Sequence, residues 1–134
     1  MNEFIEEIKA SEQLLAIIIR SEYDQSGISF FTQDENILQV GYMGYEPNKS
    51  IQPHIHNQYK RETIGTQEVI YIKEGKVKVN LYDDNKEFIS DRELYTGDCI
   101  LLIGGGHGFE VIEPTKMIEI KNGPHAHDQD KIRF

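Results

Sequence analysis

The chain has 134 residues and a formal net charge of −9, with 38% hydrophobic and 28% charged residues. A chain of this length buries about two-thirds of the surface of its unfolded form, so we expect residues 1–134 to form one domain with a sizeable core. The negative charge has the wrong sign for phosphate backbones or anionic lipids. We therefore expect neither nucleic acid nor a membrane as a partner.

The cellular setting is predicted from two further features. The single cysteine, Cys99, lies beside the apolar residues 100–102, which indicates a core thiol rather than a disulfide or a thiolate metal cluster. Residues 1–7 are acidic where a secretory signal would be basic, and no apolar run reaches the ~20 residues that cross a bilayer. These features predict a soluble, cytoplasmic protein.

The first two predicted elements differ in type. Residues 2–10 place Phe4, Ile5 and Ile8 at helical intervals after a possible Asn2 cap, which predicts a short N-terminal helix. The apolar run Leu14–Ile19 is short and rich in isoleucine, which favours a buried strand. We expect that strand to lie at the edge of the sheet, where a second copy of the chain could cover it.

The remaining elements are short β-like runs separated by turn signals such as Gly27, Glu74-Gly75 and Pro114. They cover residues 28–32, 38–45, 69–72, 77–82, 99–103 and 116–121. Apolar and polar residues alternate over residues 77–82, which is typical of an antiparallel sheet with one buried face. No amphipathic helix recurs between the runs, so the sequence predicts an all-β sandwich or barrel.

Two histidines and a carboxylate form the strongest chemical signal. In an extended chain His54 and His56 share one face, because strand side chains alternate with a period of 2. Glu68 begins an obvious strand, and His107 lies in the glycine-rich run 104–108. Three imidazoles and one carboxylate can hold one metal ion, so we predict that His54, His56, Glu68 and His107 converge.

These residues resemble the motifs of the cupin superfamily. His54-x-His56 followed by Glu68, six residues and Gly75 resembles the first motif, and Gly97 with His107 resembles the second. The resemblance to small single-domain cupins implies a double-stranded β-helix, the cupin or jelly-roll barrel, with the four predicted ligands in it. Because such cupins commonly dimerise, it also implies a homodimer.

The chain departs from the cupin pattern between His56 and Glu68. Eleven residues lie between them, whereas the family usually has only a few residues there. Glu62 in this loop is a rival carboxylate, but only Glu68 has the spacing to a glycine and begins a strand. Arg61 could hold an anionic substrate, since a guanidinium matches a carboxylate; a solvated loop charge is the alternative. We predict that the loop Asn57–Gln67 governs which molecule enters the site.

The ligand set constrains the ion without naming it. Three imidazoles and a carboxylate suit Fe, Mn, Ni, Cu or Zn and suit Ca or Mg poorly. Four protein ligands leave coordination positions open for a small molecule, as in reactive metal sites. His125 and His127 form a second H-x-H pair, which we expect to be exposed to solvent. The charges Glu119 and Lys121 indicate either a solvated strand face or the lining of a barrel mouth.

Three functions remain open on the sequence. The first is metal-dependent chemistry on a small polar molecule, as a dioxygenase, an isomerase or a lyase. The second is a binding module that captures a small ligand without converting it. The third is a metal-free sugar-nucleotide epimerase or isomerase that uses histidine as a base; residues 116–124 resemble small cupins of bacterial surface-polysaccharide pathways.

Overall fold

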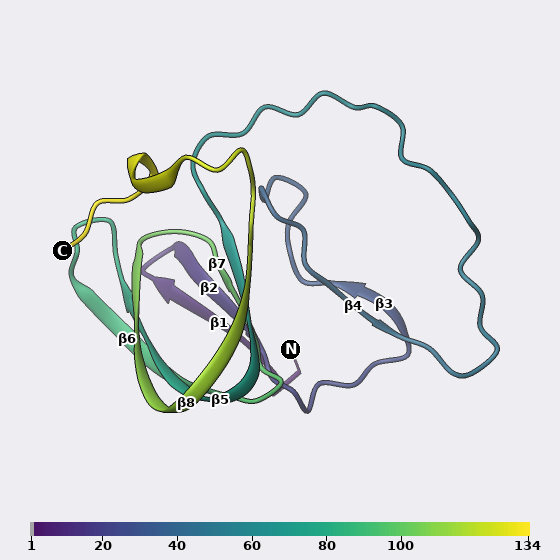
Figure 1. Cartoon of the computed structure of the whole chain (residues 1–134), viewed down its shortest axis with the longest axis horizontal. Helices are drawn as coiled ribbons and strands as arrows, with labels where there is room; N and C mark the ends of the chain where they lie inside the picture. Colours follow the sequence, from purple (N-terminus) through teal and green to yellow (C-terminus); the bar gives the residue numbers. More distant parts are fainter. Residues whose placement is uncertain (1) are drawn as a thin grey trace.

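The computed structural model describes residues 2–134, and over these residues it is an all-β protein (Figure 1). No helix in this part of the chain is long and apolar enough to cross a membrane. The elements are β1 (Ile5–Ala10), β2 (Gln13–Ile19), β3 (Gly27–Phe30), β4 (Gly41–Gly44), β5 (Glu68–Tyr82), β6 (Phe88–Tyr95), β7 (Cys99–Leu102), β8 (Gly106–Lys121) and the 3₁₀ turn η1 (His127–Asp130).

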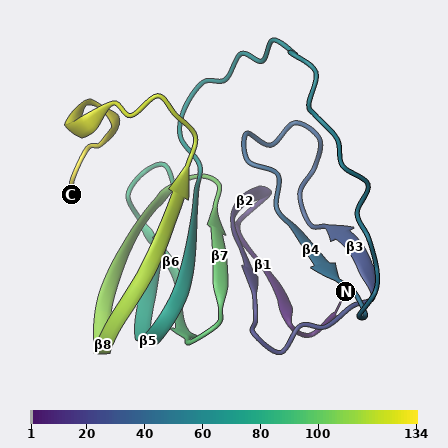
Figure 2. The same cartoon turned by 45° about the vertical axis from the view of Figure 1, so that its right-hand side comes forward.

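Six strands form one strongly curled antiparallel sheet, which makes a half-barrel (Figures 1 and 2). Its order is β1-β2-β7-β5-β6, and β8 pairs with the other edge of β5. β8 pairs with β5 along one edge, from Glu68 to Tyr82. On the other edge of β5, β7 pairs with its first part and β6 pairs with its second part. β3 and β4 form a separate two-stranded sheet.

The long strand β5 bends at Gly75 instead of ending there. The register between β5 and β8 is irregular between Ile72 and Val77, and Gly75 has a φ of +114°. A side chain at Gly75 would collide with β8 at Pro114 and Thr115. Glu74-Gly75 and Pro114 are therefore bulges inside continuous strands, and the prediction that they separate strands was wrong.

The N-terminal residues form a strand rather than the predicted helix. β1 pairs with β2 from Ile5 opposite Ile19 to Ala10 opposite Gln13, and Ile8 is buried in the core. β2 is bonded by β1 on one side and by β7 on the other, so it is not the expected edge strand. The weak helical preference of residues 2–10 is overridden because β2 needs a partner for its backbone groups.

The sheet buries side chains on both faces. One cluster fills the inside of the curl and includes Ile18, Ile72, Leu81 and Ile100. A second cluster lies on the outer face of the sheet, because successive side chains of a strand point to opposite faces. Its buried members are Ile17, Val69 and Leu101. Residues 31–40, which connect β3 to β4, cover that cluster with Phe31, Leu38 and Val40.

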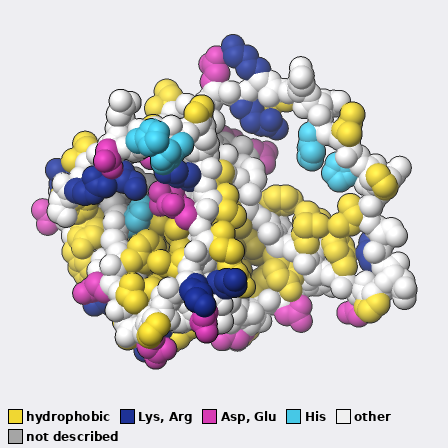
Figure 3. Space-filling view, viewed as in Figure 1, with side chains coloured by type: hydrophobic (Ala, Val, Ile, Leu, Met, Phe, Trp, Pro, Cys, Tyr) yellow, Lys and Arg dark blue, Asp and Glu magenta, His cyan; other side chains and the backbone are white. Residues whose placement is uncertain are grey.

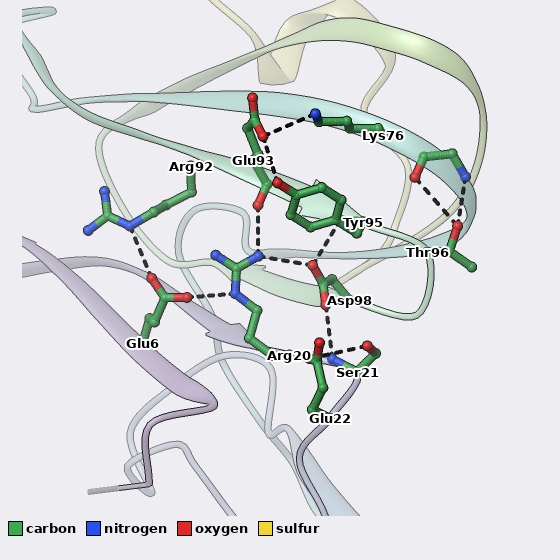
Figure 4. A network of polar contacts seen from close by, with 11 residues as sticks. Glu6, Arg20, Ser21, Glu22, Lys76, Arg92, Glu93, Tyr95, Thr96 and Asp98 are labelled. Atoms are coloured by element: carbon green, nitrogen blue, oxygen red, sulfur yellow. Dashed lines mark hydrogen bonds and ion pairs between the residues drawn. The ribbon is translucent and has the colours of Figure 1, made fainter.

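Charged side chains join β1 to β6 across the opening of the curl (Figure 4). Glu6 on β1 accepts hydrogen bonds from Arg20 at 2.6 Å and from Arg92 on β6 at 3.0 Å. Arg20 also donates to the buried carboxylate of Asp98 at 2.9 Å and to the backbone carbonyl of Glu93 at 2.7 Å. This network connects the two ends of the curled sheet, β1 and β6, which are not neighbours in its strand order.

Candidate functional site

A cavity of about 740 Å³ opens at one end of the half-barrel. Its walls come from the start of β5, the β5–β6 turn, the β7–β8 turn and the C-terminal residues 130–134. We call this region the mouth. Glu68 and His107 both line it, together with the backbone of the glycines at 104–106.

Glu68 and His107 meet in the mouth although the sequence separates them widely. The Nε2 atom of His107 lies 3.2 Å from the Oε2 atom of Glu68. The Glu68 side chain is 10% exposed and that of His107 is 33% exposed, so part of the imidazole reaches solvent. Two of the four predicted metal ligands are therefore brought together.

Neighbouring groups keep Glu68 in its anionic form. The hydrogen bond from His107 lowers the pKa of Glu68 most; burial opposes this effect, and the charges of His107 and Lys121 and a contact with Glu119 support it. Lys121 is the direct cross-strand partner of Glu68, so both side chains point to the same face. Glu119 is exposed, and neither Glu119 nor Lys121 lines the mouth, so both readings of these two charges stay predictions.

Glycines position His107 by allowing the β7–β8 turn to pass close to other backbone. Gly105 has a φ of +66°, and a side chain there would collide with the carbonyl of Tyr82 and the side chain of Leu15. A side chain at Gly106 would meet the ring of Phe134. The turn therefore depends on glycine, as expected for a chain that turns tightly beside the site.

His54 and His56 lie elsewhere, on the segment of residues 46–65, which we call the arm. The arm arches away from the half-barrel (Figure 1), and each of its residues is exposed. The two rings are 5.2 Å apart, and His54 Nδ1 lies 2.9 Å from the Gln52 carbonyl. The structure does not bring this pair to Glu68 and His107, and no three metal-ligating side chains converge among residues 2–134.

The other predicted loop residue, Arg61, also lies on the arm. Its guanidinium stacks over the ring of Tyr59 at 5.1 Å, and the neighbouring Lys60 pairs with Glu62 at 3.1 Å. None of these side chains lines the mouth as the arm is now placed. A substrate-binding role for Arg61 stays a prediction that depends on movement of the arm.

The C-terminal segment contributes residues that the sequence analysis missed. Thr66 donates a hydrogen bond to Asp130 at 2.5 Å, and the ring of Phe134 packs edge-on against Tyr82 with centroids 5.1 Å apart. The only sequence signal was an aromatic residue at the end of the chain. His125 and His127 are exposed as expected, with ring centroids 4.3 Å apart.

Histidine side chains gather in two separate places on the surface, one over the half-barrel and one on the arm (Figure 3). The comparisons of this chain with protein-family models, with curated proteins and with solved structures found no match. The cupin resemblance is therefore not supported by any match. The structure itself shows an all-β curled sheet that is compatible with a β-barrel, and a carboxylate–imidazole pair in its mouth.

Proposed function

We propose that this protein binds a small polar molecule in the mouth, at a divalent transition metal ion held by Glu68, His107, His54 and His56. The observation that carries the proposal is the approach of His107 to Glu68 within 3.2 Å at the wall of a cavity. A carboxylate and an imidazole on rigid strands form half of a mononuclear site. The cupin barrel is the architecture that we propose for the complete site.

The donors fit such an ion. A ligating carboxylate must be ionised, and the lowered pKa of Glu68 favours that form. Imidazole and carboxylate together suit Fe, Mn, Ni, Cu or Zn. The exposed part of His107 and the volume of the cavity leave room for a small molecule beside the pair.

The remaining two ligands require the arm to lie along β8. In an extended arm His54 and His56 share one face, and Ile51, Ile55 and Tyr59 occupy the opposite face. These apolar side chains are 54%, 91% and 74% exposed, and burying them would favour docking.

β8 offers a matching pair of faces. His107 pairs with Leu81 and so points to the inside of the curl, whereas Ile118 and Ile120 point to the outside and are half exposed. An arm that packs its apolar face beside Ile118 and Ile120 would turn its two histidines to the side of His107.

Each part of the chain then has a separate role. The bound ion would supply Lewis-acid polarisation of the captured molecule or, with a redox metal, oxygen chemistry. Glu68 and His107 would hold it at a fixed point of the sheet, and Lys121 would keep Glu68 anionic. The arm would cover the mouth and exclude water, and Arg61 would be carried toward an anionic group of the ligand.

A second candidate is metal-free acid–base chemistry by Glu68 and His107 alone. The specific observation is their direct contact, since a carboxylate that accepts a hydrogen bond from an imidazole orients the ring for proton transfer. A sugar-nucleotide epimerase or isomerase would use His107 as its base in this way. A binding module without turnover uses the same mouth.

Metal analysis tests the first candidate. Protein purified without chelators and then loaded with Zn²⁺ should retain about one ion per chain, and the variants His107→Ala and His54→Ala should each lose most of it. His125→Ala is the matched control, because His125 is exposed outside the mouth and should leave the metal content unchanged. Equal metal content in all four proteins would refute the ligand assignment. Activity that persists after chelation would favour the metal-free candidate.

A further inference from the structure

The arm is extended and exposed, yet it is apolar along one face. Among residues 2–134 no hydrogen bond joins residues 46–64 to the rest of the chain. Its C-terminal end is held: Asn122 donates to the Gly65 carbonyl at 3.1 Å and accepts from the Gln67 N–H at 3.0 Å, and Gln67 Oε1 accepts from the Leu38 N–H at 3.1 Å. An apolar segment that is anchored at its base and covered by nothing of its own barrel needs another surface.

The β3–β4 hairpin (residues 27–44), which precedes the arm in the chain, also has an exposed apolar face. Ile28 pairs with Met43, and these residues share a face with Phe30 and Tyr45; all four side chains are 43% to 59% exposed. Hydrophobic side chains gather there beneath the arm (Figure 3). A two-stranded sheet of this kind is marginally stable alone, so the hairpin, like the arm, presents apolar side chains that would gain from a covering surface.

The surface on which such an arm can dock is the unpaired edge of β8. In the described chain β8 pairs on one edge only, with β5, so its other edge offers backbone groups along Gly106–Lys121. Such an edge is a template for strand addition. Ile112, Ile118 and Ile120 are about half exposed beside it.

The charge of the arm is complementary to that of a half-barrel, and a second copy of this chain is the occupant we infer because the arm arches away from its own half-barrel (Figure 1). The arm carries Lys49, Lys60 and Arg61 against Glu46 and Glu62, a formal charge of +1, whereas the whole chain has a net charge of −9. The arm is therefore attracted to the acidic half-barrel of another copy. The hairpin face contributes no charge, so contact there adds no repulsion between facing side chains.

We propose that two copies exchange arms, so that the partner's arm lies along the free edge of β8 and the partner's His54 and His56 meet Glu68 and His107. This inference rests on the proposed metal site and adds that the site is shared between chains. Exchange of an identical element is a low-cost route to a closed dimer. Neither chain alone would then hold a complete site.

Mixed dimers test the sharing. One chain carries His54→Ala with His56→Ala, and the other carries Glu68→Gln with His107→Ala. The two chains bear different affinity tags, are refolded together, and are isolated by both tags in succession. In a shared site the first chain offers an intact mouth and the second an intact arm, so the mixed dimer should bind one Zn²⁺ by titration calorimetry. Each variant alone should bind none.

The possible outcomes separate the two proposals. If the wild-type protein binds about one Zn²⁺ per chain but the mixed dimer binds none, each site lies within one chain and the exchange is overturned while the metal site stands. If the wild-type protein binds no Zn²⁺, the metal site itself fails.

A second measurement addresses the surface without any metal. Ile55→Asp with Tyr59→Asp should shift the dimer to monomer in light scattering, while the control Phe88→Asp, which changes an exposed residue of β6 outside the arm, the hairpin and the mouth, should remain dimeric. A dimer that persists in the arm variant, or a wild-type monomer, would overturn the exchange.

Discussion

His107 Nε2 lies 3.2 Å from Glu68 Oε2, although in the ladder between β5 and β8 the two residues stand at opposite ends, opposite Leu81 and Lys121. A flat sheet would separate them by the length of the ladder. The curl of the sheet, together with the short turn between β7 and β8, brings them to the same opening. The pair is thus a product of the shape of the sheet as well as of the two residues.

The turn that starts β8 should tolerate no side chain at Gly105. Gly105→Ala would place a Cβ against the carbonyl of Tyr82 at a positive φ, and we expect a loss of about 1–3 kcal/mol in the free energy of unfolding. Gly108→Ala is the control, because nothing lies within 4 Å of a Cβ there. Urea denaturation of both variants checks this, and equal midpoints would contradict the close approach.

The buried carboxylate of Asp98 should be important for stability. It is 1% exposed and accepts hydrogen bonds from Arg20 and from the backbone N–H groups of Ser21 and Tyr95. Asp98→Ala leaves these donors without an acceptor, so we expect a loss of about 3–5 kcal/mol. Thermal and urea unfolding measure the effect.

The control for Asp98→Ala is the ion pair between Lys78 on β5 and Glu110 on β8. Lys78 lies 2.9 Å from Glu110, and the two side chains are 36% and 59% exposed, so Lys78→Met should change the unfolding midpoint little. If both variants lost the same stability, burial would not explain the importance of Asp98.

Stability should depend on pH through Glu6. Burial raises the pKa of this carboxyl, but hydrogen bonds and charge from Arg20 and Arg92 outweigh burial, so its pKa lies below the ordinary value of 4.5. The folded state therefore gains stability above that value and loses it as the pH falls through the lowered pKa. The advantage of wild type over Glu6→Gln in urea unfolding should shrink from about pH 5 downward. A constant difference across this range would contradict the ion pairs.

The thiol of Cys99 should be unreactive in the folded protein. Burial raises its pKa to about 11, with a smaller effect from the charge of Asp98. Since the thiolate is the nucleophile, alkylation by iodoacetamide near neutral pH should be far slower in native than in unfolded protein. Mass spectrometry of timed samples measures both rates. Equal rates would mean that Cys99 is accessible.

The local pattern of the sequence was enough for the all-β class and for several strands. β2, β7 and the two halves of β5 are apolar runs or alternations that propensity alone identifies. β6 and the first half of β8 were missed because their exposed polar residues hide the alternation. β1 was assigned wrongly, because its pairing with β2 is tertiary information that residues 2–10 do not contain.

Only part of the site was predicted, again because the local sequence does not contain tertiary information. The convergence of Glu68 and His107 was predicted from residue type and spacing, and the two side chains lie 3.2 Å apart. Their role as metal ligands stays a prediction. The Thr66–Asp130 and Tyr82–Phe134 contacts could not, since they depend on where the C-terminal segment crosses the mouth. The position of His54 and His56 depends on what the arm docks against, which no local pattern encodes.

The X-ray absorption spectrum of the Zn²⁺-loaded protein tests the proposed metal site most directly. The account predicts three imidazoles and one carboxylate around the ion in wild type, and two imidazoles or no bound ion in His107→Ala. A wild-type ion surrounded by oxygen ligands alone, or an unchanged imidazole count in His107→Ala, would contradict it.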